Sequence, residues 1–297
     1  MSQRNTEKPL GGLGVLVVQS VWHGLGLGLE SSPMSDNTTW IDSHAHLSMF
    51  EPDEIPAVLD RAEARGVAGV LTPSTGRDDL DASIALAGDY PGQVVAAAGV
   101  HPHEADSLDA PLKRLIEQAC TRAGVVAVGE IGLDYHYLNS PREDQIAAFV
   151  WQLDLAIELD LPVVVHNRES WSDLASILGE RQGRVRGVCH SFAEGPDEAR
   201  RVLEMGLFVG ISGMVTFKGA DNIREMVAAL EPNRVLVETD SPFLAPVPHR
   251  GRQNEPSFVP LVGQRLAKEW KKPAEEIAAL SSAGFRELFH VGHDWPD

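Results

Sequence analysis

Several histidine and acidic residues follow short apolar runs of the sequence, and their types suit metal binding. These residues are His44, His46, His101, His103, Glu130, His166, His190, Glu238 and Asp240. Imidazoles bind borderline divalent metals, and carboxylates add charge and can bridge two ions. A single histidine at a strand end is more often a hydrogen-bonded structural residue than a ligand. A convergent set has little reason to exist without metal, and the predicted ligands are His44, His46, Glu130, His166, His190 and Asp240.

The alternation of side chains along a strand tests this set. Side chains two residues apart point the same way, so Asp42, His44 and His46 are expected to share one face. Glu238 and Asp240 are expected to share a face for the same reason, whereas Cys189 points away from His190 and is predicted to be core. Asp42 and Glu238 are interpreted either as groups that fix a histidine tautomer or as buried polar residues of the barrel floor.

The elements that must position these residues are strands alternating with helices. The apolar runs are Trp40–Asp42, Val67–Leu71, Val94–Val100, Val125–Gly129, Val163–Val165, Val185–Cys189, Leu207–Ile211 and Val235–Val237. Stretches with helical spacing lie between them, as at Ile55, Val58, Leu59 and Ala62. Eight such units in residues 39–297 predict a (β/α)8 TIM barrel, with an open doubly wound sheet as the alternative. In a barrel, residues that follow the strands converge on one face.

Residues 1–38 differ from the rest of the chain. They are rich in glycine and show neither strand alternation nor helix caps. We predict a disordered N-terminal extension, or a segment upstream of a start at Met34; a signal peptide is the weaker interpretation, because Glu7 dilutes the charge of Arg4 and Lys8. The glycines are not a dinucleotide fingerprint, because no strand precedes them and no helix follows, so no nucleotide cofactor is expected.

Composition excludes several classes of function. Hydrophobic residues make up 43% and charged residues 23%, which is ordinary for a soluble globular protein and argues against a membrane location. The only cysteines, Cys120 and Cys189, are too few for a disulfide framework and indicate a reducing, cytoplasmic setting. A net charge of −18 argues against broad adhesion to nucleic acid, so a phosphate-bearing ligand needs a local site.

Seven segments of the chain together resemble the TatD family of metal-dependent deoxyribonucleases. They are IDSHAHL, GVHPHE, VGEIGLDY, PVVVHNRES, CHSF, VGISGMVTFK and ETDSPFLAPVPHRGRQNEP. The resemblance covers nearly the whole chain after residue 38 and implies a two-metal hydrolase on the predicted barrel. Two departures stand out: Ala193-Glu194 replaces a small hydroxyl residue and glycine, which bears on the loop near the second ion, and Gly284 replaces an asparagine, which bears on packing.

The resemblance assigns roles to residues of this sequence. It implies that His44, His46 and Asp240 hold one ion, that His166 and His190 hold the other, and that Glu130 bridges both. The cofactors are then two divalent ions, Mg²⁺, Mn²⁺ or Zn²⁺, which attract a phosphodiester despite the acidic composition. Asp240 is the candidate to orient or deprotonate the attacking water, and Glu130 is the second catalytic candidate.

Basic and imidazole groups after the strands are the candidate substrate contacts. They are His101, His103, Arg168, Arg250 and Arg252. These side chains can reach a phosphate above the metals, and the alternative is that they are solvated loop charges. Few basic groups in total predict a short nucleic-acid footprint with a shallow salt dependence.

Three functions are compatible with these patterns. The first is a 3′-5′ exonuclease-type deoxyribonuclease acting on single-stranded DNA, with RNA as a further substrate. The second is an amidohydrolase, or a D-aminoacyl-tRNA deacylase, using the same metal centre. Glu130 favours the first, since many amidohydrolase barrels carry a carboxylated lysine after the fourth strand. The third is a non-catalytic metal-binding scaffold, which would not require arginines beside the metals. None of the three needs an obligate protein partner.

Overall fold

The computed structural model describes residues 38–291 of the chain. The prediction of a disordered or mis-assigned extension over residues 1–38 falls almost entirely on residues outside this range. Among the helices of the described residues, none is both long enough and apolar enough to cross a membrane.

Eight parallel strands form one sheet, in which each strand pairs with the next along the chain. The strands are β1 (Trp40–Asp42), β2 (Val67–Pro73), β3 (Val94–Ala98), β4 (Val125–Asp134), β5 (Val163–Arg168), β6 (Gly187–Cys189), β7 (Phe208–Ile211) and β8 (Val235–Val237). All of the predicted apolar runs therefore lie on strands. The main difference is β4, which continues five residues beyond the predicted Gly129 and contains Glu130 within the strand.

The sheet closes between its first and last strands. At and just beyond the ends of β1 and β8, Ser43 N donates to Val237 O at 3.1 Å, His46 N to Ser241 O at 2.7 Å and Asp240 N to His44 O at 2.9 Å. A parallel bridge joins Ala45 to Ser241. Closure confirms the predicted TIM barrel and excludes the open doubly wound alternative, whose edge strands stay unpaired.

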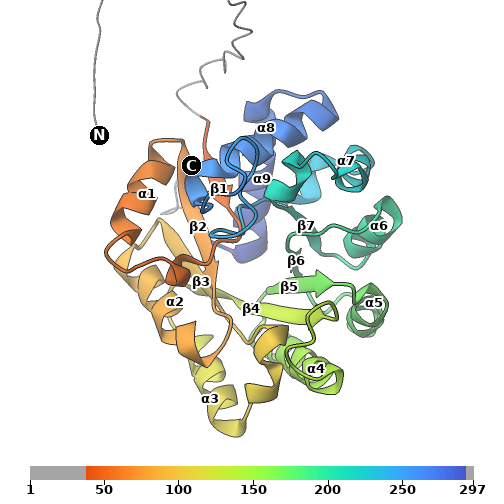
Figure 1. Ribbon diagram of the computed structural model, residues 1–297. Coiled ribbons are helices and arrows are strands. Elements are labelled where there is room, and N and C mark those ends of the chain that lie inside the picture. Colours follow the sequence, from red (N-terminus) through yellow and green to blue (C-terminus); the bar gives the residue numbers. More distant parts are fainter. Residues whose placement is uncertain (1–37, 292–297) are drawn as a thin grey trace, which may run out of the picture. The chain divides into compact units, whose positions relative to one another are not determined.

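Helices follow the strands and surround the barrel (Figure 1). They are α1 (Ile55–Glu63), α2 (Arg77–Asp89), α3 (Ala110–Ala119), α4 (Arg142–Leu159), α5 (Trp171–Gly179), α6 (Pro196–Glu204), α7 (Asp221–Ala228), α8 (Val259–Trp270) and α9 (Ala274–Phe289). Short 3₁₀ turns are η1 (Leu47–Met49), η2 (Pro102–Ser107), η3 (Gly213–Thr216), η4 (Pro232–Arg234) and η5 (Pro256–Phe258).

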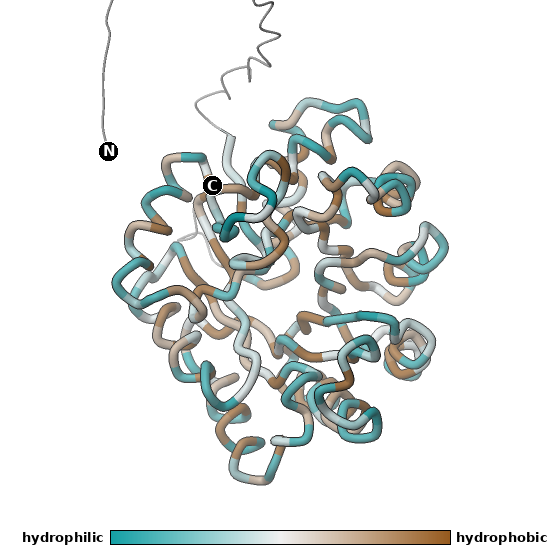
Figure 2. The backbone as a smooth tube through the Cα atoms, viewed as in Figure 1, coloured by the Kyte–Doolittle hydropathy of each residue, from teal (hydrophilic) through white to brown (hydrophobic). Residues whose placement is uncertain are grey.

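Prolines in the first turn, a side-chain cap and an amphipathic pattern explain why these segments form helices. Proline occupies the first turn of α1, α3, α6 and α8, where its missing N–H costs no hydrogen bond. The Asp109 carboxylate caps α3 by accepting from Leu112 N at 2.8 Å. Hydrophilic and hydrophobic residues alternate along the outer helices, as amphipathic helices over a sheet require (Figure 2).

The barrel interior is a closed apolar core. Its buried cluster takes residues from all eight strands and three from α9, namely Phe285, Leu288 and Phe289. A Cβ on Gly284 of α9 would meet Phe208 at 2.9 Å and Asn233 O at 3.7 Å, and Asn233 lies in η4, just before β8. Helix α9 therefore packs against the amino-terminal end of the barrel, which leaves the carboxyl ends of the strands for the site. The Gly284 departure concerns packing, as predicted.

Trp40 ties the first strand to α8. Its side chain is fully buried, and a Cβ on Gly263 would lie 2.1 Å from two atoms of the indole ring. Only glycine fits there, because any side chain would have to displace either the ring or the helix.

Candidate metal centre

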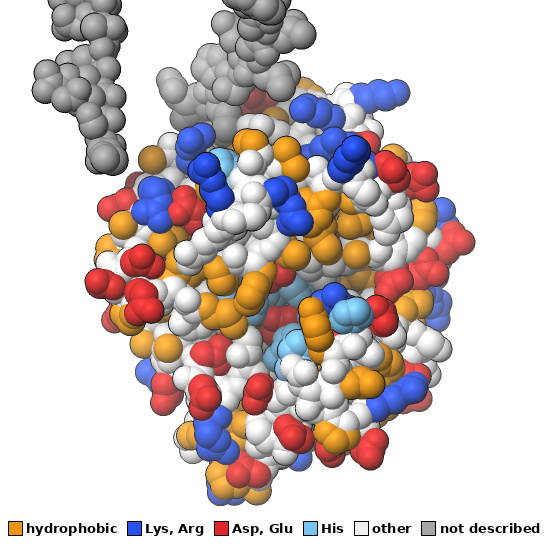
Figure 3. All heavy atoms as spheres, viewed as in Figure 1, with side chains coloured by type: hydrophobic (Ala, Val, Ile, Leu, Met, Phe, Trp, Pro, Cys, Tyr) orange, Lys and Arg blue, Asp and Glu red, His pale blue; other side chains and the backbone are white. Residues whose placement is uncertain are grey.

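Histidine and acidic side chains gather at the carboxyl ends of the strands. In the space-filling view, histidines and an acidic side chain lie in a hollow at the centre of one face, with hydrophobic side chains around it (Figure 3). The structure brings all six predicted ligands together: His44, His46, Glu130, His166, His190 and Asp240. Three overlapping groups of them, with His101, are close enough to hold a cation.

One oxygen of Glu130 faces the histidines that follow β1. Its Oε2 atom lies 3.2 Å from His44 Nε2 and 3.5 Å from His46 Nε2, and these two nitrogens are 3.2 Å apart. Asp240 Oδ1 completes this group at 3.9 Å from His44 Nε2 and 3.6 Å from His46 Nε2. The prediction that His44 and His46 share a face is confirmed.

The other oxygen of Glu130 faces a different set of imidazoles. Its Oε1 atom lies 2.9 Å from His190 Nε2 and 3.0 Å from His166 Nδ1, and these nitrogens are 3.4 Å apart. His101 Nε2 lies 3.6 Å from the same oxygen. The carboxylate thus stands between two nitrogen groups and turns one oxygen toward each.

A local irregularity in β4 aims this carboxylate inward. The pairing of β4 with β5 shifts register between Val128 and Ile131, on either side of Glu130. Such a bulge breaks the alternation and re-aims a side chain. Two residues on, Gly132 has φ of 139°, and a Cβ there would lie 2.1 Å from His166 O. The close approach of β4 to the His166 backbone therefore requires glycine.

Burial and neighbouring charges shift the pKa values of the clustered side chains in different directions. Burial works to raise the pKa of Glu130, but His190, His44 and His101 outweigh it and hold that pKa well below its ordinary value. For His190, burial opposes the charged form, yet Glu130 and Glu238 raise its pKa well above 6.5. Burial lowers the pKa of His44 and, further, that of His101. Glu130 is therefore an anion among imidazoles of unequal basicity.

The donor set fits divalent cations. Ligands of one cation at bond lengths of about 2.0–2.1 Å stand about 3.0–3.5 Å apart, which is close to the separations above. Glu130 Oε2 is buried and makes no hydrogen bond with the described residues, although an anionic oxygen normally accepts several. A cation would satisfy it. Mixed imidazole and carboxylate ligands suit Zn²⁺ and Mn²⁺, and the carboxylates also suit Mg²⁺.

Asp134 is a further candidate residue of the site, which the sequence patterns did not single out. Its Oδ2 atom lies 3.1 Å from His166 Nε2 and 3.1 Å from His103 Nε2. Burial works to raise the pKa of Asp134, but the hydrogen bonds from His103 and His166 outweigh it and hold the pKa below its ordinary value. A carboxylate on the outer nitrogen of a ligand histidine fixes the ring and its tautomer. The available signal was its position four residues after Glu130.

Asp42 and Glu238 have different surroundings. The Asp42 carboxylate accepts from Thr239 N at 2.8 Å, Thr239 Oγ1 at 2.6 Å and His44 N at 3.3 Å, and it does not hold an imidazole. Burial raises its pKa to about 8. The interpretation as a tautomer-fixing group is thus wrong for Asp42, which braces the β1–β8 junction. Glu238 Oε1, in contrast, lies 3.3 Å from His190 Nδ1 and 2.5 Å from Ser191 N.

The side chains of His101 and His103 lie against the cluster of predicted ligands. A phosphate contact carried by an exposed loop would lie farther from it. His101 Nδ1 accepts from His103 N at 3.1 Å, so the neutral ring carries its proton on Nε2, the atom that faces Glu130. His101 is therefore a hydrogen-bond donor in the hollow, and His103 supports Asp134. That either one contacts substrate stays a prediction.

Two of the three candidate arginines lie over aromatic rings. The Arg168 guanidinium lies 4.6 Å from the centroid of Tyr137, and that of Arg250 lies 3.7 Å from the centroid of Phe217. Arg252 is exposed in the loop after β8. Stacking leaves the edge of a guanidinium able to donate to phosphate.

Two further predictions concern residues beside the cluster. At the Ala193-Glu194 departure, Glu194 Oε1 accepts from Asn167 Nδ2 at 3.0 Å, which joins the loop after β6 to the residue following His166. Cys189 is fully buried, as predicted for a core residue, and both cysteines are free thiols.

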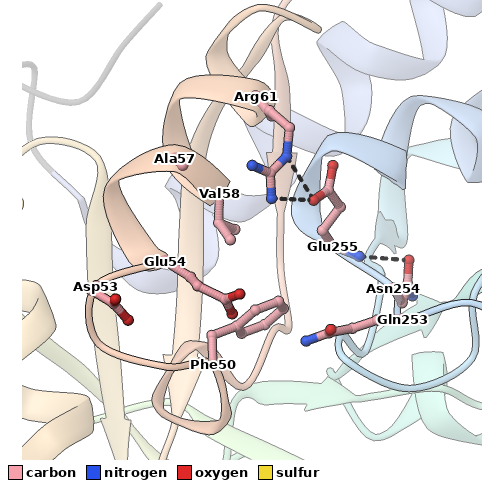
Figure 4. Close-up of a pocket in the computed structure, with 9 residues that line it drawn as sticks. All are labelled: Phe50, Asp53, Glu54, Ala57, Val58, Arg61, Gln253, Asn254 and Glu255. Carbon is pink, nitrogen blue, oxygen red and sulfur yellow. Dashed lines mark hydrogen bonds and ion pairs between the residues drawn. The ribbon is translucent and has the colours of Figure 1, made fainter.

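A pocket of about 310 Å³ lies outside the cluster, between α1 and the loop after β8. Arg61 spans it and donates twice to Glu255 Oε2, at 2.6 and 2.9 Å (Figure 4). None of the predicted metal ligands lines it. The pocket marks the joint between α1 and the loop that carries Asn254, where the two pack together, and it is separate from the cluster of predicted ligands.

Known proteins resemble this chain over the whole barrel. The metal-dependent hydrolase YabD of Bacillus subtilis, uncharacterized by its name, is 34% identical over 84% of this chain and 98% of its own length. The 3′-5′ ssDNA/RNA exonuclease TatD of Pantoea vagans is 35% identical over 79% of this chain and 92% of its own. The crystal structure of the TatD homologue YJJV of Escherichia coli has a TM-score of 0.80 and 32% identity, covering 85% of this chain and 98% of that one.

A family model carries the same conclusion. The model described as TatD related DNase matches residues 41–290, which include β1 from its second residue, the other seven strands in full and all the clustered side chains. Together with the relatives and the closed barrel, this match confirms the resemblance drawn from the seven segments. The chain belongs to the TatD family and is a metal-dependent hydrolase.

Proposed function

We propose that this hydrolase cleaves phosphodiester bonds at the 3′ end of single-stranded DNA, and of RNA, using two divalent ions. The observation that carries the proposal is the Glu130 carboxylate, which turns one oxygen to His44 and His46 and the other to His166 and His190. A bridging carboxylate between two nitrogen groups is suited to a metal pair. The Pantoea vagans relative, a 3′-5′ ssDNA/RNA exonuclease by name, supports the choice of substrate.

In the proposed site, His44, His46 and Asp240 would hold one ion and His166 and His190 the other, with Glu130 as a ligand shared by both. When bound, the ions would lower the pKa of water in the site and offset the negative charge of the phosphate. Mg²⁺, Mn²⁺ and Zn²⁺ are the candidates, and elemental analysis of the purified protein identifies the native pair.

Residues of the chain carry the other parts of the reaction. The Asp240 side chain is 14% exposed, whereas that of Glu130 is 2% exposed, which supports Asp240 as the acceptor of a proton from the attacking water. His101 presents Nε2–H to the hollow and is placed to donate to a phosphoryl oxygen. The Asp134 carboxylate accepts from His166, and Glu238 lies 3.3 Å from His190 Nδ1, which supports a role for both in orienting these rings.

The proposal includes a location and a partner. Two free, buried cysteines support a reducing compartment, and we place the enzyme in the cytoplasm. Single-stranded nucleic acid is its partner as substrate, and the proposal requires no obligate protein partner.

The test offers purified protein with each metal to 5′-labelled single-stranded DNA, RNA, a D-aminoacyl-tRNA and simple amides. We expect stepwise shortening of the labelled strands from the 3′ end. Glu130→Gln should abolish shortening and reduce the number of bound metals measured by calorimetry. Glu158→Gln, on the exposed side of α4, is the matched control. Hydrolysis of the tRNA ester or the amides alone would contradict the proposal, and no turnover with any metal would favour the scaffold.

A further inference from the structure

Exposed apolar side chains concentrate around the metal centre. Among the described residues, the large hydrophobic side chains with high exposure are Met49, Leu115, Tyr137, Leu138, Phe243 and Val247. All except Leu115, on α3, lie in the segments that follow β1, β4 and β8 on the carboxyl face of the barrel. Figure 3 shows hydrophobic side chains around the hollow. Exposed apolar groups that gather on one face mark a binding surface.

Two aromatic rings of this set stand on opposite sides of the cluster. Phe243, after β8, is 51% exposed, and its ring centroid lies 6.1 Å from that of His46. Tyr137, after β4, is 55% exposed, and its centroid lies 5.5 Å from that of His103. In a closed barrel of eight strands, the fourth and eighth strands face each other across the axis. The rings therefore flank the metal centre.

The backbone beneath each ring is held while the ring itself stays exposed. Phe243 N donates to Asp240 O at 2.9 Å, and the buried Asn254 donates to Phe243 O at 2.6 Å. Tyr137 N donates to Asp134 Oδ1 at 3.0 Å. The backbone that carries each ring is thus bonded to Asp240 or Asp134, which holds the base of the ring close to the cluster. A preorganised exposed ring binds a flat ligand with little loss of entropy.

Charge favours nucleic acid as the occupant. The Arg168 guanidinium lies 4.6 Å from the Tyr137 centroid and adds a cation beside one ring. Flat aromatic faces next to a cation and a phosphate-binding metal centre match a nucleotide chain, which alternates bases with phosphates. A duplex keeps its bases stacked inside, so only unpaired bases can lie on these rings.

We propose that Phe243 and Tyr137 are base-stacking platforms on either side of the scissile phosphodiester, and that they give the enzyme its preference for single strands. This inference rests on the proposed function. Phe243, next to Asp240 and His46, carries a base adjoining the scissile phosphate, and Tyr137 with Arg168 carries a base on the other side.

The test compares Phe243→Ala and Tyr137→Ala with Leu115→Ala, an exposed apolar control on α3. Substrates are a 5′-labelled single strand and the same strand with abasic sites at its last two 3′ positions. Loss of one stacked base predicts a rise in KM of roughly 5- to 150-fold for each platform variant, with kcat little changed. Phe243→Trp should retain a low KM, and the metal content of all variants should equal that of the wild type.

The abasic strand separates stacking from a structural effect. On the abasic strand, the affinity of the wild type should fall, and the Phe243→Ala substitution should cause no further loss of affinity. Equal KM values for wild type and both alanine variants on the normal strand would overturn the inference. It would also be overturned if an alanine substitution raised KM on the abasic strand as much as on the normal strand. Failure of the proposed function shows differently, because the wild type would then shorten neither DNA nor RNA, and both proposals would fall.

Discussion

Asp134 shows how a residue outside the ligand set can control the site. Its Oδ2 atom lies 3.1 Å from an outer nitrogen of both His166 and His103. With that nitrogen engaged, His166 turns Nδ1 toward Glu130 at 3.0 Å. The carboxylate therefore fixes which nitrogen of His166 is offered to a cation, and its charge makes the ring a better ligand.

Replacing Asp134 with asparagine keeps the shape of the side chain and removes its charge. Because an amide can present a donor as well as an acceptor, His166 would lose its fixed orientation. We expect metal affinity to fall roughly 10- to 100-fold. Calorimetric titration with Zn²⁺ or Mn²⁺ measures this, with Asp60→Asn on the exposed side of α1 as the control. Unchanged affinity would show that Asp134 only packs.

The sequence predicts which side chains gather in the cluster better than it predicts the groups that support them. Strand alternation predicted that His44 and His46 face one way, and their Nε2 atoms are 3.2 Å apart. The same rule predicted a shared face for Glu238 and Asp240, but it assumes extended backbone, and Asp240 has a φ of 58°. It also left Asp42 undecided, since only the fold shows that Thr239 satisfies that carboxylate.

At the scale of elements, apolar runs predicted the existence of all eight strands, and their ends were less certain. The run Val125–Gly129 stopped where β4 continues through Glu130 to Asp134, because polar residues interrupt the pattern while the backbone still pairs with β5. The bulge beside Glu130 depends on that pairing, so a single strand's sequence does not reveal it.

The contact between α8 and β1 gives a test of packing. In Gly263→Ala the new methyl group would lie 2.1 Å from the Trp40 ring, and overpacking of this kind costs about 1–3 kcal/mol of unfolding free energy. Gly88→Ala, on the exposed side of α2 with open space around it, should be neutral or stabilise by about 0.4–1 kcal/mol. Urea denaturation of both variants checks this, and equal stabilities would contradict it.

The joint between α1 and the loop after β8 gives a pH prediction. Burial works to raise the pKa of Glu255, but its hydrogen bonds from Arg61 and Ser257 outweigh it and hold the pKa below 4.5. The carboxylate therefore stabilises the fold above about pH 4.5, and this contribution is lost as the pH falls through the folded-state pKa.

Arg61→Met should accordingly destabilise the protein at neutral pH by roughly 0.2–1 kcal/mol, the range of a partly exposed ion pair. The difference from wild type should shrink in acid, where Glu255 is protonated in both proteins. Denaturation midpoints across this range measure it, and Arg65→Met, a nearby exposed cation, is the control. A difference that is independent of pH would mean that Arg61 acts through packing.

For the whole molecule, we expect bound metal to raise the free energy of unfolding. The hollow gathers acidic and imidazole groups from both ends of the chain, so cations should bind the folded state and not the unfolded one. Ions at 100 times their dissociation constant would add about 2.7 kcal/mol. We expect chelation to lower the melting temperature, with a smaller drop in Glu130→Gln, and calorimetry checks both. Equal drops in the two proteins would place the bound metal elsewhere.

The count of strand-helix units predicted a barrel, but closure was beyond the sequence pattern. An open doubly wound sheet shows the same alternation, and the difference lies in whether the first strand meets the last. Here they meet through hydrogen bonds among residues 43–46 and 237–241, which include His44, His46 and Asp240, the ligands predicted for one ion. Contacts between positions so far apart leave no local pattern.

That junction has a consequence for the making of the protein. Asp42 and Thr239, which brace it, are 197 positions apart, and Asp240 joins His44 and His46 only after β8 has been synthesised and docked. A nascent chain that has emerged only as far as β7 lacks Asp240 and the barrel seam together. In the proposed site, hydrolysis would therefore require β8 to be synthesised and docked.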